Sequence, residues 1–274
     1  MQFKLLSAIG IIIIVSGHCY HGGMELAYNW FPPYSYNLAL FVFISGYFYK
    51  TDYEENVGKY IWKRTKRFLI PAYLWNIFYG GMVAFLGLFG FTIGAKPDLY
   101  NLFVMPFVDG EAFQYNLGSW FVYPLFLVCI INVLFRKFLK LIHLDNEFIV
   151  LIVYLAIGMI GINTALENPT AINGIVKLLV RTMFFLPCYE FGRFYKAVLE
   201  KKDTLNNVAY FAIIFAVQLI LLTFCKDLEY TPSSFTKFNN GFIIPYISSI
   251  TAIAFWLRVS RLLVPAIGNL SLIH

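Results

Sequence analysis

The sequence predicts an all-α integral membrane protein, a polytopic bundle of about eight complete transmembrane helices with a truncated ninth. Of its 274 residues, 59% are hydrophobic and only 13% are charged, whereas soluble domains are about 45–50% apolar and about 25% charged. The mean hydropathy is +0.69. The apolar residues also fall into runs near the length of about 20 residues that crosses a bilayer as a helix.

The predicted spans are the apolar runs between charged or turn-rich breaks. They comprise residues 3–20, 34–49, 68–91, 120–135, 148–163, 175–195, 208–225 and 241–257. A ninth run begins at Leu262 and stops with the sequence at His274. Lys4 followed by an apolar run also fits a signal peptide, but no small-residue cleavage site follows, so this run is predicted to be the first span.

The basic residues predict the orientation of the bundle. With a cytoplasmic N-terminus, most of the 21 Lys and Arg residues fall in the inner segments, as the positive-inside rule requires. This orientation places His18 near the outer end of the first span and predicts a long outer loop over residues 92–119. A multi-pass protein in contact with the lipid bilayer follows.

Other classes of function fit the sequence poorly. The net charge of +6 lies in short clusters between apolar runs, and no nucleic-acid-binding motif is present, so no nucleic-acid partner is predicted. Neither CxxC nor Cys/His metal spacing occurs among the four cysteines, Cys19, Cys129, Cys188 and Cys225. His18, His21 and Glu25 would lie along one side of a continuing helix, but Gly22-Gly23 is expected to break it. No metal site is predicted.

The first feature that points to chemistry is His18, at the end of the apolar stretch GIIIIVSGHCYH. An ionisable residue in a transmembrane span is a functional hypothesis by default. Ser7 lies 11 residues earlier and Lys4 lies 14 residues earlier, within about 40° of the same helical line at ~100° per residue. The alternative is a histidine that simply sits hydrated at the interface.

The second feature is the basic stretch WKRTKRFLIPAYLW at the inner boundary of the third span. Arg64 and Arg67 are spaced i, i+3, and arginine forks bind phosphate oxygens bidentately. The pair therefore predicts a site for a polyanionic cytosolic cofactor. The alternative is that positive-inside topology alone explains the cluster.

Three further motifs have structural interpretations. Ser45 and Gly46, in FVFISGYFY, are small residues that allow helices to approach closely. Trp120, in GSWFVYPL, fits an interfacial anchor. Arg181 and Glu190 lie on opposite faces of one span, so each is expected to pair with another helix or with water.

In combination these stretches resemble the membrane acyltransferase family 3. The resemblance rests on GHCYH, FVFISGYFY, KRTKRFLIPAYLW, SWFVYPLF and IGNLSLIH, in this order, from the first helix to the last residue. It implies one integral-membrane acyltransferase-like domain over residues 1–274, in a bacterial cell inner (plasma) membrane. Members transfer an acyl group, usually acetyl, from cytosolic acyl-CoA to a hydroxyl of a cell-surface or lipid-linked glycan, which implies O-acetylation in polysaccharide modification.

The resemblance also implies roles for single residues. His18 would be catalytic, either taking the proton of the acceptor hydroxyl or briefly carrying the acyl group, and both alternatives stay open. Arg64 and Arg67 would hold acetyl-CoA. The family commonly has Arg eleven residues before the histidine, where this chain has Ser7; we hypothesise that Lys4 substitutes for it in binding the cofactor.

Two further points complete the expectations. The resemblance to a terminal helix begins at Gly268 and stops at His274, so the domain is expected to be C-terminally incomplete. Aromatic residues over 29–36 (NWFPPYSY) could stack on sugar rings or anchor at the membrane interface. The alternative functions are a glycan or small-molecule transporter or flippase, and a non-catalytic membrane partner in polysaccharide assembly.

Overall fold

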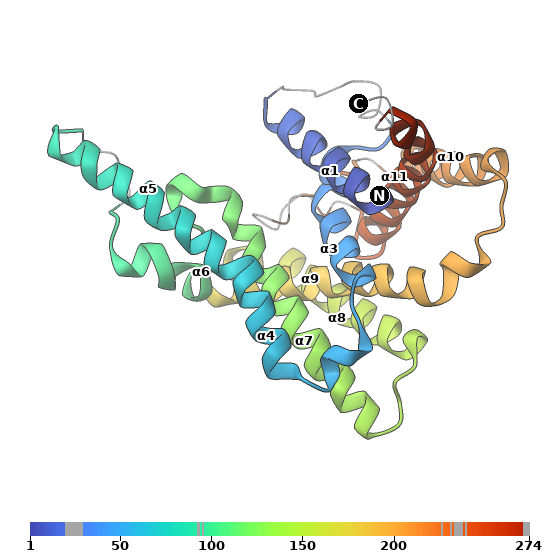
Figure 1. Cartoon of the computed structure of the whole chain (residues 1–274), viewed down its shortest axis with the longest axis horizontal. Coiled ribbons are helices and arrows are strands. Elements are labelled where there is room, and N and C mark those ends of the chain that lie inside the picture. Colours follow the sequence, from blue (N-terminus) through green and yellow to red (C-terminus); the bar gives the residue numbers. More distant parts are fainter. Residues whose placement is uncertain are drawn as a thin grey trace. The chain divides into compact units, whose positions relative to one another are not determined.

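The computed structural model describes residues 1–19, 30–91, 94, 96–225, 227–230, 232, 238 and 240–270. Throughout these residues the regular structure is helical, and no strand occurs among them. The all-α class is therefore confirmed. Figure 1 traces the helices in chain order.

Among the described residues, five helices are long and apolar enough to cross a membrane. They are Val57–Leu88, Gln114–Leu141, Glu147–Glu167, Asn207–Phe224 and Ile244–Ala266. Two shorter apolar helices, Gln2–His18 and Asn37–Tyr47, lie where the first two spans were predicted. The chain is thus a multi-pass membrane protein, while the count of eight spans and the cytoplasmic N-terminus stay predictions.

Helix α9 (Gly174–Phe194) occupies the predicted span 175–195 but is not one of the five. Its sequence contains four charged residues, Lys177, Arg181, Glu190 and Arg193. Charged side chains make insertion of a helix into hydrocarbon costly. Length and apolar character alone therefore do not assign α9 to the membrane.

The predicted start of a separate ninth span at Leu262 is wrong. Helix α11 runs without a break over Ile244–Leu270. Arg258 and Arg261 interrupt the apolar pattern, but arginine does not break a helix. Both arginines instead bind Asp203.

The chain divides into two compact units, which are described separately. The first comprises Met1–Phe48, Pro187–Thr231 and Thr236–His274, and the second comprises Tyr49–Leu186 and Pro232–Phe235. The remaining helices, in chain order, are α1 (Gln2–Cys19), η1 (Pro33–Ser35), α3 (Asn37–Tyr47), η2 (Thr51–Glu54), α4 (Val57–Arg64), η3 (Thr65–Leu69), α5 (Ile70–Leu88), η4 (Tyr100–Val104), α6 (Met105–Val108), η5 (Gln114–Phe121), α7 (Val122–Leu141), α8 (Glu147–Glu167), η6 (Pro169–Ala171), η7 (Tyr195–Leu199), η8 (Glu200–Lys202) and α10 (Asn207–Phe224). A single domain over 1–274 stays a prediction.

In the first unit, glycines bring helix backbones into contact. A Cβ added to Gly46 of α3 would lie 1.8 Å from the carbonyl oxygen of Tyr189, and one added to Gly192 would lie 1.9 Å from that of Phe43. The α3 backbone and the end of α9 therefore touch at positions where only glycine fits. This confirms the small-residue interpretation of Gly46.

Charged and phenolic side chains connect α11 to the segment before α10 in the first unit. Both carboxylate oxygens of Asp203 accept hydrogen bonds, from Arg258 at 3.0 Å and from Arg261 at 2.9 Å. Arg261 also donates to the hydroxyl of Tyr195 at 2.8 Å. We call Tyr195, Asp203, Arg258 and Arg261 the Asp203 cluster. It fastens α11 to the η7–α10 segment.

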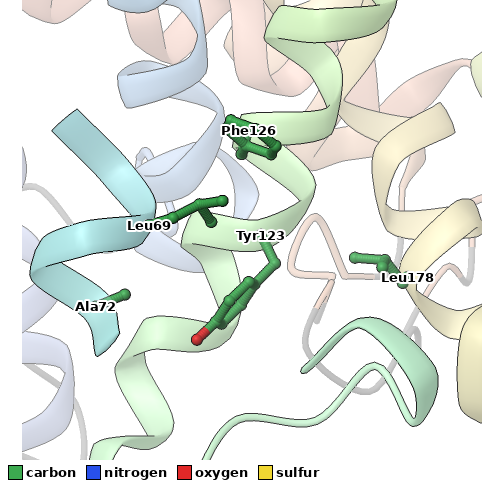
Figure 2. Packing of buried hydrophobic residues seen from close by; sticks show 5 residues of the cluster. All are labelled: Leu69, Ala72, Tyr123, Phe126 and Leu178. Atoms are coloured by element: carbon green, nitrogen blue, oxygen red, sulfur yellow. The ribbon is translucent and has the colours of Figure 1, made fainter. Parts of the chain in front are cut away.

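The second unit is built on a long rod formed by α4, η3 and α5, beside which α7 packs (Figure 1). Its apolar core holds Leu69, Ala72, Tyr123, Phe126 and Leu178 (Figure 2). These residues come from η3, α5, α7 and α9. The core thus joins the rod to the two later helices.

The predicted outer loop over 92–119 is a packed structure in its described part. It forms η4, α6 and η5, and its Asn116 side chain donates to the carbonyl of Ala72 at 3.4 Å and to Asn76 Oδ1 at 2.7 Å. Ala72 precedes the end of α5 at Leu88 by 16 residues, about 24 Å of helix. The returning segment supplies hydrogen-bond partners to the fully buried amide of Asn76, which would be costly to leave unpaired inside an apolar helix.

Candidate functional site

His18 lies in the last turn of α1 with an exposed side chain. One face of α1 is buried against its neighbours through Leu6, Gly10 and Ile13. The other face is exposed and carries Lys4, Ala8, Ile11, Val15 and His18. Lys4 and His18 therefore share a face, as predicted, and 14 residues separate them by about 21 Å along the axis.

Two hydroxyl groups on or near the His18 helix, those of Tyr34 and Ser7, are both engaged in hydrogen bonds. Tyr34 donates its hydroxyl proton to the carbonyl of Gly17 at 3.5 Å, next to His18. Ser7 donates to the carbonyl of Phe3 at 2.8 Å, so its hydroxyl is bound within the helix itself. His21 and Glu25 lie outside the described residues, and among those described no group of three His, Cys, Asp or Glu could hold a metal.

Most of the aromatic stretch 29–36 packs inward in its described part. The Phe31 ring stacks on that of Phe255 with centroids 4.6 Å apart. The Tyr36 hydroxyl accepts from Trp256 Nε1 at 2.7 Å. Both residues are almost fully buried, so they hold α11 and are not free to stack on sugars. Trp30, which is 39% exposed, is the surface aromatic of this stretch.

The two predicted cofactor arginines have different environments in the second unit. Arg64 is buried, with its guanidinium 4.9 Å from the centroid of the Tyr60 ring and 5.7 Å from that of Phe68. Arg67 is exposed. Arg67 lies in η3, a π-helical turn, and such turns occur frequently at functional sites.

Arg67 lines an open groove of about 250 Å³ in the second unit. The other lining residues are Phe68, Pro71, Ala72, Trp75, Asn116, Ser119 and Val122. Arg67 and Trp75 are eight residues apart, or about 12 Å along the helix axis. The groove thus joins a cation to an apolar wall and to polar side chains from η5. We call it the Arg67 groove.

Two uncharged polar residues of the groove wall, Asn116 and Ser119, lie beside two more that do not line it, Asn76 and Tyr123. We call these four residues the Asn76 cluster. Asn76 donates to the carbonyl of Leu102 at 2.7 Å and accepts from Asn116. The buried hydroxyls of Ser119 and Tyr123 make no hydrogen bond to any residue that the structure describes. The sequence prediction did not include this cluster; its one signal was Asn76, a lone amide in an apolar run.

The predicted interfacial anchor, Trp120, has a different partner. It is half-buried, and the guanidinium of Arg181 lies 4.6 Å from the centroid of its ring. Arg181 also donates to the carbonyls of Pro232, at 3.1 Å, and of Gly110. Its partners therefore include a ring of the helix η5, in agreement with the predicted pairing with another helix, and two loop carbonyls that the sequence did not indicate.

Comparison with known families decides the class of the protein. The family model described as an acyltransferase domain, that of acyltransferase family 3, matches residues 3–273. The chain belongs to this family. The protein is therefore a membrane acyltransferase, and the match includes both the His18 helix and the Arg67 groove.

The chain was also compared with curated proteins and with solved structures, and neither comparison found a match. Family membership does not assign roles to single residues, so those of His18, Lys4, Arg64 and Arg67 stay predictions. Lys4 and His18 belong to the first unit, and Arg64 and Arg67 belong to the second.

Proposed function

We propose that this membrane acyltransferase moves an acetyl group from cytosolic acetyl-CoA to a hydroxyl of an extracytoplasmic carbohydrate, in the inner membrane of a bacterium. The observation that carries the proposal is the family match over residues 3–273. The acceptor is a cell-surface or lipid-linked glycan. This glycan and acyl-CoA are the partners of the enzyme besides the lipid bilayer.

His18 is proposed as the catalytic group. Its side chain is exposed at the end of an apolar helix, where an acceptor hydroxyl can reach it. The imidazole takes the hydroxyl proton while the oxygen attacks the thioester carbonyl; the carbon–sulfur bond then breaks and CoA leaves as the thiolate. An acyl-histidine formed before this attack is the second route.

The donor is proposed to bind through basic residues. Arg67 is exposed in a groove and is suited to a phosphate. Arg64 is buried against two rings, so we propose that it supports the shape of this site. Lys4 lies about 21 Å from His18 along α1, and we propose that it faces the anionic end of the donor.

The test is the release of CoA from labelled acetyl-CoA by membranes that contain the chain, with a crude surface-glycan acceptor. His18→Asn should lower acceptor-dependent release by about 10²–10⁴-fold, since a general base contributes about that much. The matched control is His143→Asn, which alters an exposed histidine at φ 57°, a conformation that Asn tolerates.

The alternatives predict different outcomes in the same experiment. A transporter would move the carbohydrate without release of CoA. A non-catalytic partner would make His18→Asn silent. Either result would contradict the proposed transfer.

A further inference from the structure

The hydroxyls of Ser119 and Tyr123 are unusual because they are buried without a partner. Ser119 lines the Arg67 groove, and the Tyr123 hydroxyl faces Ser119 and Asn76. Neither oxygen makes a hydrogen bond to any described residue. Buried polar groups in proteins are nearly always hydrogen-bonded, and each exception needs an explanation.

The neighbouring amides do not need these hydroxyls. Asn76 Nδ2 donates to the carbonyl of Leu102 at 2.7 Å, and Asn116 Nδ2 donates to Asn76 Oδ1 at 2.7 Å. The packing of η5 against α5 is therefore already fastened. Figure 2 shows the Tyr123 hydroxyl pointing away from Phe126, so it is also not covered by that ring. This packing leaves the two buried hydroxyls without a hydrogen bond to the described residues.

A hydroxyl relay would satisfy both groups at once. Each hydroxyl is one donor and also an acceptor. If Tyr123 donates to Ser119 Oγ, the proton of Ser119 remains for an acceptor in the groove. The serine side chain can occupy three staggered χ1 rotamers, and Ser119 lines the groove. A carbonyl oxygen in the Arg67 groove would complete the chain.

The composition of the groove indicates the kind of ligand. An exposed cation, Arg67, lies about 12 Å along the helix from Trp75, and Phe68 and Pro71 line the wall between them. The volume of about 250 Å³ is below the roughly 300–1,000 Å³ of pockets for whole drug-sized ligands. The groove therefore suits one arm of a larger molecule, with a phosphate at one end and carbonyls along its chain.

We propose that the Arg67 groove binds the pantetheine arm of the acyl donor. Its phosphate lies at Arg67, and one of its amide carbonyls accepts a hydrogen bond from Ser119, which Tyr123 positions. The name of the donor rests on the proposed function, whereas the groove and the two hydroxyls do not. A phospholipid offers the same chemistry, a phosphate and a chain with carbonyls, so the experiment must separate the two.

The experiment measures the binding of labelled coenzyme A, 4′-phosphopantetheine and adenosine 3′,5′-bisphosphate to the full chain in phosphatidylcholine nanodiscs. Ser119→Ala should weaken the first two ligands by about 5–10-fold, the effect of one hydrogen bond, and should leave the bisphosphate unaffected. Tyr123→Phe should have a smaller effect. The double variant should bind no more weakly than Ser119→Ala, because the two groups act in series.

Two controls separate binding from folding. Ser248→Ala removes another buried serine hydroxyl without a described partner, in the first unit, and should leave binding unchanged. Without ligand, Ser119→Ala and Tyr123→Phe should unfold at the same temperature as the wild type or higher, because each removes an unpaired buried group. A structural role would lower the unfolding temperature of both.

Three outcomes would overturn the inference. They are unchanged phosphopantetheine affinity in Ser119→Ala, no phosphopantetheine binding by the wild type, and displacement of the labelled ligand by phosphatidylglycerol but not by unlabelled coenzyme A. The proposed function fails separately, if the protein binds coenzyme A in this manner but never transfers the acetyl group. If acceptor-dependent release depends on His18 while Ser119→Ala binds normally, only the inference fails.

Discussion

The Asp203 cluster of the first unit and the Asn76 cluster at the Arg67 groove are both polar, mostly buried and set among apolar helices, but they differ in which groups lack a hydrogen bond. Both carboxylate oxygens of Asp203 are bonded, and Arg258 Nε lacks a partner on a guanidinium that is bonded through its other nitrogen. At the groove the amides of Asn76 and Asn116 are bonded, whereas the hydroxyls of Ser119 and Tyr123 have no partner among the described residues. A satisfied buried network holds a structure, and an unsatisfied one is costly unless something else completes it. The comparison therefore separates a scaffold from a candidate binding site.

The largest loss of stability is expected from a substitution of Asp203. Asp203→Ala should lower the free energy of unfolding by about 3–5 kcal/mol, because it leaves the buried charge of Arg258 without its partner. Thermal unfolding of the protein in detergent measures this. The matched control, Asp145→Ala, removes an exposed carboxylate. If both variants unfold at the same temperature, the Asp203 cluster does not stabilise the fold as this account requires.

A smaller loss of stability is expected from the hydrogen-bonded amides of the Asn76 cluster. Asn76→Ala removes the side-chain donor to the carbonyl of Leu102 and leaves the Asn116 amide only its 3.4 Å bond to the carbonyl of Ala72, which should cost about 1–3 kcal/mol. Asn163→Ala is the control, since Asn163 is exposed and bonds only within its helix, to Glu167. A neutral Asn76→Ala would mean that η5 does not depend on this network to pack against α5.

The smallest effect is expected where a complete ion pair is exposed. Lys177 binds Glu111, whose side chain is 47% exposed, and Glu111→Gln should change stability by only about 0–1 kcal/mol. The change should shrink further in high salt. A loss as large as that of Asp203→Ala would show that burial does not separate the two kinds of pair.

The fold could be predicted from the sequence where hydrophobic pattern decides the outcome. The apolar runs predicted the helical class, and Gly46 was correctly identified as a close contact. The hydrophobic pattern gave a wrong helix boundary where charged side chains form ion pairs with residues distant in the sequence. Arg258 and Arg261 looked like the end of a span, but arginine does not break a helix, and α11 continues past both residues, which form ion pairs with Asp203.

The candidate site was harder to predict than the helices. The shared face of Lys4 and His18 follows from helical spacing, so the sequence was sufficient. Arg64 and Arg67 looked equivalent at i, i+3, and only packing against Tyr60 and Phe68 buries the first of them. The return of η5 to Ala72 depends on hydrogen bonds over 40 residues or more. No local pattern reports such a contact.

The most direct test of the central claim, acyl transfer across the membrane, uses sealed vesicles that contain the protein. Labelled acetyl-CoA is supplied on one side and the carbohydrate acceptor is enclosed on the other. We predict that the wild type labels the enclosed carbohydrate and releases an equal amount of CoA outside, and that His18→Asn does neither. Movement of unmodified carbohydrate without CoA release, or equal labelling by His18→Asn, would contradict this account.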